Sequence, residues 1–115
     1  MPCGIDDALA LDHLEEVRRT ELARYTKLEV DRHTFGYLWY PTRTIGLKQT
    51  LAEQLALTSE RPEVFEVQFT AGGFGWIVVH LEGIERDELA ELVFEAWRLT
   101  APRSLVEARH GRLPK

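Results

Sequence analysis

The chain has 115 residues, of which 44% are hydrophobic and 29% are charged, and its formal net charge is −5. This size and balance predict a single globular domain over residues 1–115, and the negative charge argues against non-specific nucleic-acid binding over the whole surface. The single cysteine excludes an intramolecular disulfide. The sequence shows neither an apolar run of about 20 residues nor a secretory signal, so we expect a cytoplasmic protein that does not enter a membrane.

The N-terminal part of the chain predicts a helix followed by a strand. Leucines at near-helical spacing indicate a helix over about residues 7–24. Residues 25–31 then alternate between apolar or small side chains and charged ones, which is typical of a half-buried strand. Its inner side would carry Thr26, Leu28 and Val30. A turn follows at residues 31–33.

Two more strands and a capped helix are predicted next. The aromatic stretch Thr34–Tyr40 suits a pleated surface and ends at Pro41, which lacks a ladder donor. Thr44–Lys48 indicates a short strand with Ile45 and Leu47 on one face. Thr50 and Glu53 have the spacing of a capping box, so a helix should begin there. We expect its apolar face to consist of Leu51, Ala52, Leu55 and Ala56.

The middle of the chain predicts a β-hairpin. Val64–Thr70 alternates, which places Phe65, Val67 and Phe69 inward. The glycine-rich segment Ala71–Gly75 permits a tight return into a strand that ends near Leu81. A phosphate-binding loop would instead lead from a strand into a helix, so the hairpin interpretation is favoured.

The C-terminal part predicts a strongly amphipathic helix and then a short one over about residues 103–109. The first carries a broad apolar stripe and ends before Pro102; the stripe consists of Leu89, Leu92, Val93, Ala96 and Trp97. The predicted order is therefore α-β-β-β-α-β-β-α. Strands grouped in runs with short connections indicate a two-layer α+β fold, with an antiparallel sheet of about five strands packed on helices.

No reaction centre is visible in the sequence. The four histidines lack metal-ligand spacing, and neither serine lies in a nucleophile elbow. Cys3 has no base near it in the sequence. We therefore expect a protein that is not an enzyme and that holds no metal and no cofactor.

Basic residues gather toward the C-terminus and form the first candidate site. Residues 98–115 include five basic residues and one acid, whereas the rest of the chain is acidic. Such a strip can contact phosphate, although basic residues also favour helix C-termini for electrostatic reasons. The candidate DNA contacts are Arg98, Arg103, Arg109 and Arg112, with Lys48, Arg43 and Arg32 on the hairpins as secondary contacts.

The second candidate site is the face of the predicted sheet that points away from the helices. If Ile77, Val79 and Leu81 face the core, the alternate residues of that strand face outward. An apolar and aromatic patch with a polar rim often marks a protein contact. This candidate interaction site consists of Trp76, Val78 and His80. The alternative is that another part of the chain covers Trp76.

The second half of the chain resembles the MmcQ/YjbR family. The resemblance covers roughly residues 33–106, and the spacing of its pieces is more specific than any one piece. The Glu21–Tyr25 segment departs from the family pattern, which has a longer first helix and a Pro-Gly turn before the first strand. The matching pieces are Leu47-Lys48, Arg61–Phe65, Gly75–Leu81, Asp87–Leu89 and Glu95–Arg103.

The resemblance implies a two-layer α+β fold and the function of a DNA-binding or regulatory protein. The same fold is similar to that of secretion chaperones, which are small acidic dimers that bind unfolded peptide. A protein-interaction module, or a homodimer that uses the sheet face, is therefore the alternative function.

Overall fold

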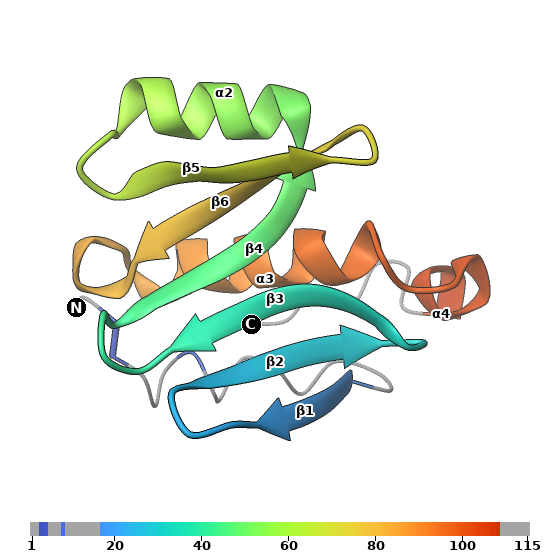
Figure 1. Ribbon diagram of the computed structural model, residues 1–115. Helices are drawn as coiled ribbons and strands as arrows, with labels where there is room; N and C mark the ends of the chain where they lie inside the picture. Colours follow the sequence, from blue (N-terminus) through green and yellow to red (C-terminus); the bar gives the residue numbers. More distant parts are fainter. Residues whose placement is uncertain (1–2, 5–7, 9–16, 109–115) are drawn as a thin grey trace.

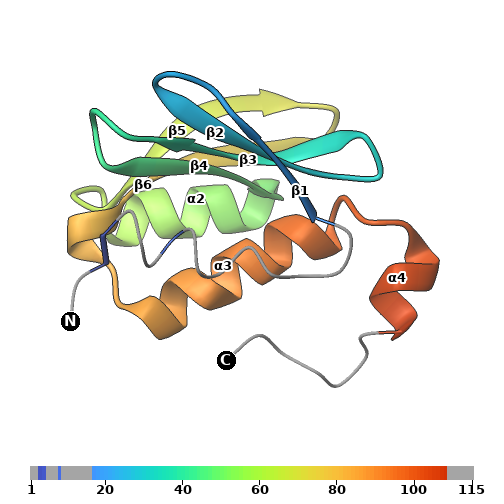
Figure 2. The ribbon, with the colours of Figure 1, turned by 90° about the horizontal axis from the view of Figure 1, so that it is seen from below.

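The computed structural model describes residues 3–4, 8 and 17–108 of the chain. Antiparallel pairing joins six strands into one sheet in the order β1-β2-β3-β4-β6-β5. Helices α2 and α3 both lie on one face of this sheet (Figures 1 and 2). The elements are β1 (Val17–Glu21), β2 (Tyr25–Val30), β3 (His33–Trp39), β4 (Thr44–Thr50), α2 (Leu51–Glu60), β5 (Phe65–Ala71), β6 (Phe74–His80), a 3-10 turn (Leu81–Gly83), α3 (Arg86–Arg98) and α4 (Arg103–Ala108).

The predicted two-layer α+β fold is confirmed, with one more strand than expected. Residues 17–21 form the edge strand β1, which pairs antiparallel with β2. The helix prediction is wrong from Val17 to Arg24, because β2 supplies backbone partners that leucine spacing cannot reveal. A hydrogen bond from the Leu22 N–H to the Tyr25 carbonyl, at 2.8 Å, closes the hairpin. The predicted helical residues 7 and 9–16 lie outside the described residues.

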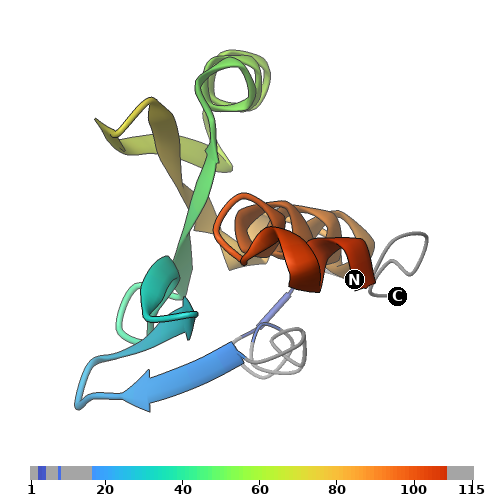
Figure 3. The same cartoon turned by 90° about the vertical axis from the view of Figure 1, so that its right-hand side faces the viewer.

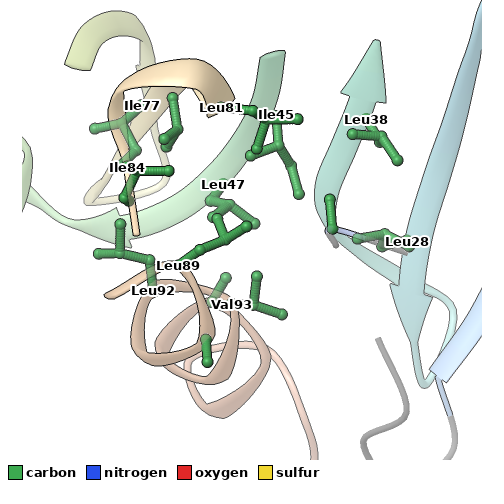
Figure 4. Packing of buried hydrophobic residues seen from close by; sticks show 14 of the residues in the cluster. Leu28, Leu38, Ile45, Leu47, Ile77, Leu81, Ile84, Leu89, Leu92 and Val93 are labelled. Carbon is green, nitrogen blue, oxygen red and sulfur yellow. The ribbon is translucent and has the colours of Figure 1, made fainter. Parts of the chain in front are cut away.

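The alternation predicted for the central strands is confirmed. Thr26, Leu28 and Val30 are buried in β2, and Ile45 and Leu47 are buried in β4. The predicted apolar stripe of α3 is also buried, and Leu47 of β4 lies beside Leu89 of that stripe (Figure 4). Because one face of the sheet packs on helices, a period of two along each strand is required.

Helix α2 begins as predicted but buries a different face. The Thr50 hydroxyl accepts a hydrogen bond from the Glu53 N–H at 3.1 Å, which confirms the cap. However, Leu51 and Leu55 are 48% and 68% exposed, so the predicted apolar face is wrong. The buried residue is Gln54.

Gln54 takes this place because its amide satisfies backbone carbonyls of the β5–β6 hairpin. Its Nε2 donates to the Trp76 carbonyl at 2.9 Å and to the Phe69 carbonyl at 3.1 Å. Gly75 allows this close approach: a Cβ built there would lie 2.6 Å from the Cβ of Gln54. An apolar side chain at residue 54 would leave those carbonyls without this donor.

Strand β5 also departs from its predicted pattern. Phe65 is buried as expected, but Val67 and Phe69 are 58% and 41% exposed. A register irregularity lies between these two residues, and an extra residue of this kind turns the following side chains to the opposite face. Phe69 therefore lies on the face of the sheet that is remote from the helices, next to Trp76.

Candidate functional site

The face of the sheet opposite α2 and α3, here called the open face, carries several aromatic side chains that are exposed or half-buried. Figure 3 shows the helices on one side of the sheet only, and within the described ranges no helix lies over the other side. Strand register places the outward side chains in cross-strand rows: Tyr25 opposite Trp39, and Lys48 opposite Trp76. These side chains could contact a partner without disturbing the core.

Five rings form a contiguous aromatic cluster across the open face. Tyr37 stacks on Trp39 with ring centroids 5.7 Å apart and an interplanar angle of 12°. Tyr37 also lies 6.2 Å from Tyr25 and 5.9 Å from Trp76, and Trp76 lies 5.2 Å from Phe69. The cluster therefore draws on β2, β3, β6 and β5. Aromatic pairs at such distances stabilise one another by about 0.5–1.5 kcal/mol, so the five rings support one another as one packed surface.

Gly46 in β4 makes room at the centre of the cluster. A Cβ at residue 46 would lie 3.0 Å from two carbons of the Trp39 ring and would collide with the Gln68 amide oxygen. Trp39 and Gln68 thus extend over bare backbone between Tyr37 and Val78, which flank Gly46 in the strand register. The position of Trp39 and Gln68 over β4 therefore depends on the absence of a side chain at residue 46.

Cationic side chains border the cluster. Lys48 lies with its Nζ 4.0 Å from the centre of the Phe74 ring, and partial burial lowers the pKa of this lysine below its usual value. Lys27 lies opposite Tyr37, Arg18 lies on the same face opposite Glu29, and Arg24 adjoins Trp39.

The open face is more positive than the rest of the chain. With four cations and the two carboxylates of Glu29 and Glu66, its formal charge is +2, in a chain whose net charge is −5. An acidic protein with one aromatic and cationic face presents that face selectively to a polyanion.

The predicted interaction residues all lie on the open face but differ in exposure. Trp76 is only 7% exposed, because Tyr37 and Phe69 lie against it. Val78 is half-buried, and the His80 imidazole contacts the Glu66 carboxylate. The site is thus larger than Trp76, Val78 and His80: sequence reasoning missed Tyr25, Tyr37, Trp39 and Phe69. The alternation of Tyr37 and Trp39 around the buried Leu38 is the signal that could have revealed half of them.

Three of the predicted DNA-contacting arginines pair with carboxylates. Arg98 at the end of α3 pairs with Glu95, and Arg103 in α4 pairs with Glu107 at 2.8 Å. The hydrogen bond that Arg98 donates to the Glu95 carboxylate is the main reason that the pKa of Arg98 is raised. Arg43 pairs with Glu82 at 3.0 Å. Arg109 and Arg112 lie outside the described residues.

The secondary candidates Lys48 and Arg32 lie in different parts of the sheet. Lys48 lies on the open face, whereas α3, which ends at Arg98, lies behind the sheet (Figure 3). Arg32 occupies the turn between β2 and β3, beside Asp31, Glu29 and Arg18. Within the described ranges, the predicted basic strip is therefore partly neutralised and is separated from Lys48 by the sheet.

The part of the chain that the structure describes contains neither a candidate metal site nor a candidate membrane-spanning helix. No group of three or more His, Cys, Asp or Glu side chains there is placed to hold a metal ion. No helix among the described residues is long and apolar enough to cross a membrane.

Comparisons with known proteins identify the fold and the family. A family model described as YjbR matches residues 9–99. The match begins well before residue 33, so it includes the Glu21–Tyr25 segment, and it ends at residue 99. The crystal structure of Deinococcus radiodurans protein DR2400, a DUF419 domain, is similar with a TM-score of 0.73 and 17% identity over 86% of this chain and 78% of that chain. No curated protein matches the chain.

Proposed function

The chain belongs to the YjbR family, and we propose that it binds single-stranded nucleic acid across the open face of its sheet. The family resemblance implies that this nucleic acid is DNA. The observation that carries the proposal is the aromatic cluster: ring surfaces from four strands lie beside cationic side chains, on a face that no described helix covers. The proposed role is binding without catalysis.

The chemistry of the open face suits unpaired bases. Every base has a planar π-face, and stacking on an aromatic side chain contributes about 1–3 kcal/mol per base without requiring a particular sequence. Tyr37, Trp39 and Phe69 offer partly exposed rings for such stacking. Lys27 lies opposite Tyr37, Lys48 lies opposite Trp76, and Arg24 lines a pocket together with Trp39. These cations would contact the phosphates that connect the stacked bases.

The same geometry argues against duplex DNA as the main ligand. Base faces are buried in a duplex, so the aromatic cluster would have nothing to stack on. Duplex affinity comes mainly from phosphate neutralisation by free cations. Arg98 and Arg103 already pair with carboxylates, which weakens the candidate phosphate strip.

Fluorescence anisotropy with labelled oligonucleotides tests the proposal. The probes are an oligothymidylate of about twelve nucleotides, within the site sizes of single-strand binding modules, and a duplex of the same length. At about 50 mM salt we expect the single strand to bind at least tenfold more tightly than the duplex. Raising the salt to about 200 mM should weaken binding with a slope near −2, because about three phosphates are neutralised at about −0.7 each.

Matched variants separate the two candidate surfaces. Phe69→Ala removes an exposed ring from the open face and should weaken single-strand binding by at least fivefold, which corresponds to about 1 kcal/mol of stacking. Lys48→Met keeps the aliphatic stem and should reduce the salt slope by about 0.7. Arg98→Gln and Arg103→Gln are the controls and should leave binding unchanged.

Two results would overturn the proposal. One is the absence of oligonucleotide binding at low salt. The other is binding that is weakened by Arg98→Gln and Arg103→Gln but not by Phe69→Ala. That result would place the binding site at the arginines of the C-terminal part and not on the open face.

A second candidate function is self-association through the open face, since the half-buried aromatics there would also suit a protein contact. Sedimentation over a range of protein concentrations distinguishes the two. A dimer that Phe69→Ala converts to a monomer would favour this alternative, whereas a concentration-independent monomer that binds oligothymidylate favours nucleic-acid binding.

A further inference from the structure

A pocket at one end of the open face extends the candidate interface. It has a volume of about 460 Å³ and is lined by Arg24, Trp39, Pro41, Thr42, Thr44 and Val78. This volume falls within the range of about 300–1,000 Å³ that is common for small-molecule sites. The pocket lies where the β1–β2 and β3–β4 turns meet, because the Tyr40 N–H donates to the Arg24 carbonyl at 3.0 Å.

We infer that this pocket binds a nucleobase together with its own phosphate, as in a nucleoside monophosphate or at the phosphorylated end of a strand. The inference rests on the proposed function and assigns a specific ligand to one end of the same face. Its basis is the combination of a ring wall, a cation and hydroxyl groups around one space.

The ring wall is Trp39. Tyr37 stacks against this side chain, and Trp39 also forms part of the pocket wall. Pro41 and Val78 supply further apolar surface. A planar ligand in the pocket would therefore stack on Trp39 and extend the Tyr37–Trp39 pair. Its ring would also cover apolar surface of the pocket that is otherwise in contact with water.

The cation is Arg24. Among the described residues it is the one charged residue that lines the pocket, its side chain is exposed, and it forms no ion pair with any of the others. A guanidinium presents a planar set of donors that matches phosphate oxygens in pairs. Arg24 thus favours an anionic group on the planar ligand.

The hydroxyls belong to Thr42 and Thr44. Their Oγ1 atoms lie 2.7 Å apart and share a hydrogen bond, so one O–H donor and three acceptor lone pairs of the two hydroxyls remain to meet polar atoms of a ligand. Thr44 is buried and fixed by β4, while Thr42 is exposed in the turn. A base edge or a phosphate oxygen could use either hydroxyl.

Quenching of tryptophan fluorescence tests the pocket with small probes. The probes are deoxyadenosine monophosphate, deoxyadenosine and inorganic phosphate. We expect the nucleotide to bind at least tenfold more tightly than either of the other two, because charge-assisted hydrogen bonds add to stacking. Equal binding of nucleotide and nucleoside would overturn the inference.

Two variants locate the site. Arg24→Gln removes the cation from an exposed turn and should bring nucleotide affinity down to that of the nucleoside. Val78→Phe fills the pocket and should abolish nucleotide binding. Arg32→Gln, in the turn at the opposite end of the strands, is the matched control and should change nothing. Unchanged nucleotide binding in Arg24→Gln would overturn the assignment even if Val78→Phe proved unstable.

A further comparison separates the two sources of the ligand and the two proposals. If a phosphorylated oligothymidylate binds more tightly than the unphosphorylated one, and Arg24→Gln removes the difference, the pocket holds a strand end. If only the mononucleotide binds, the pocket inference stands and the proposed function fails. If oligonucleotides bind but neither the terminal phosphate nor the mononucleotide matters, the pocket inference fails and the proposed function stands.

Discussion

The two faces of the sheet carry different types of side chain. The helix face carries aliphatic side chains such as Ile45, Leu47 and Ile77, which are almost fully buried in the core. The open face carries Tyr25, Tyr37, Trp39, Trp76 and Phe69, which cover one another only in part. A sheet that packs on helices with one face normally carries polar residues on its other face. The aromatic cluster is therefore not required for packing of the core.

The largest expected loss of stability comes from substitution of Trp97, a fully buried residue of α3 on the helix face of the sheet. Trp97→Ala should lower the free energy of unfolding by about 3–5 kcal/mol, because it leaves a cavity against the helix face of the sheet. Urea unfolding followed by circular dichroism measures this loss. A loss near zero would show that α3 is not packed as described.

Two glycines on opposite faces give the next comparison. Gly75→Ala should cost about 1–3 kcal/mol, since its new Cβ would lie 2.6 Å from the Gln54 Cβ and would push α2 away. Gly46→Ala meets Trp39 and the far end of the Gln68 side chain, which can move, so we expect a smaller stability loss. Gly46→Ala should nevertheless weaken oligonucleotide binding by displacing Trp39. Gly75→Ala should instead lower stability and have a smaller effect on binding. Thermal unfolding and anisotropy on both variants distinguish the two roles; equal effects on binding would contradict the comparison.

A smaller effect is expected at the junction of α2 and α3. Arg61 donates to both carboxylate oxygens of Glu88 at 2.7 Å and to the Gly83 carbonyl at 3.2 Å. The hydrogen bond with Glu88 raises the pKa of Arg61. Because both side chains are about one-third exposed, solvent screening limits their contribution.

Arg61→Met should therefore cost about 1 kcal/mol or less of stability in a urea titration, and oligonucleotide binding should be unaffected. A loss above about 3 kcal/mol would mean that the pair acts as a buried one.

Much of the helix face could be predicted from the sequence, because burial against α3 imposes strict periodicity. Thr26, Leu28 and Val30 in β2 and the stripe ending at Trp97 follow from spacing alone. Strand β1 could not be predicted in this way, since it is held at a sheet edge by backbone pairing with β2. Gln54 was missed because its burial depends on two carbonyls of a distant hairpin.

The candidate site was harder to predict because it is assembled across the sheet. Tyr25 and Phe69 are far apart in the chain, yet both belong to one aromatic cluster through Tyr37 and Trp76. Register in β2–β6 decides which rings meet, and the irregularity before Phe69 moves that ring to the open face. Outward alternation in the sequence predicted Trp76, Val78 and His80, while the rings that surround them required the fold.

The central claim is that the open face, and not the basic C-terminal part, binds single-stranded nucleic acid. The most direct measurement is the anisotropy of labelled oligothymidylate with Phe69→Ala beside the double variant Arg98→Gln, Arg103→Gln. We expect at least a fivefold loss of affinity for Phe69→Ala, in the range of one lost stacking contact, and no change for the double variant. Unchanged affinity in Phe69→Ala, together with a loss in the double variant, would contradict it.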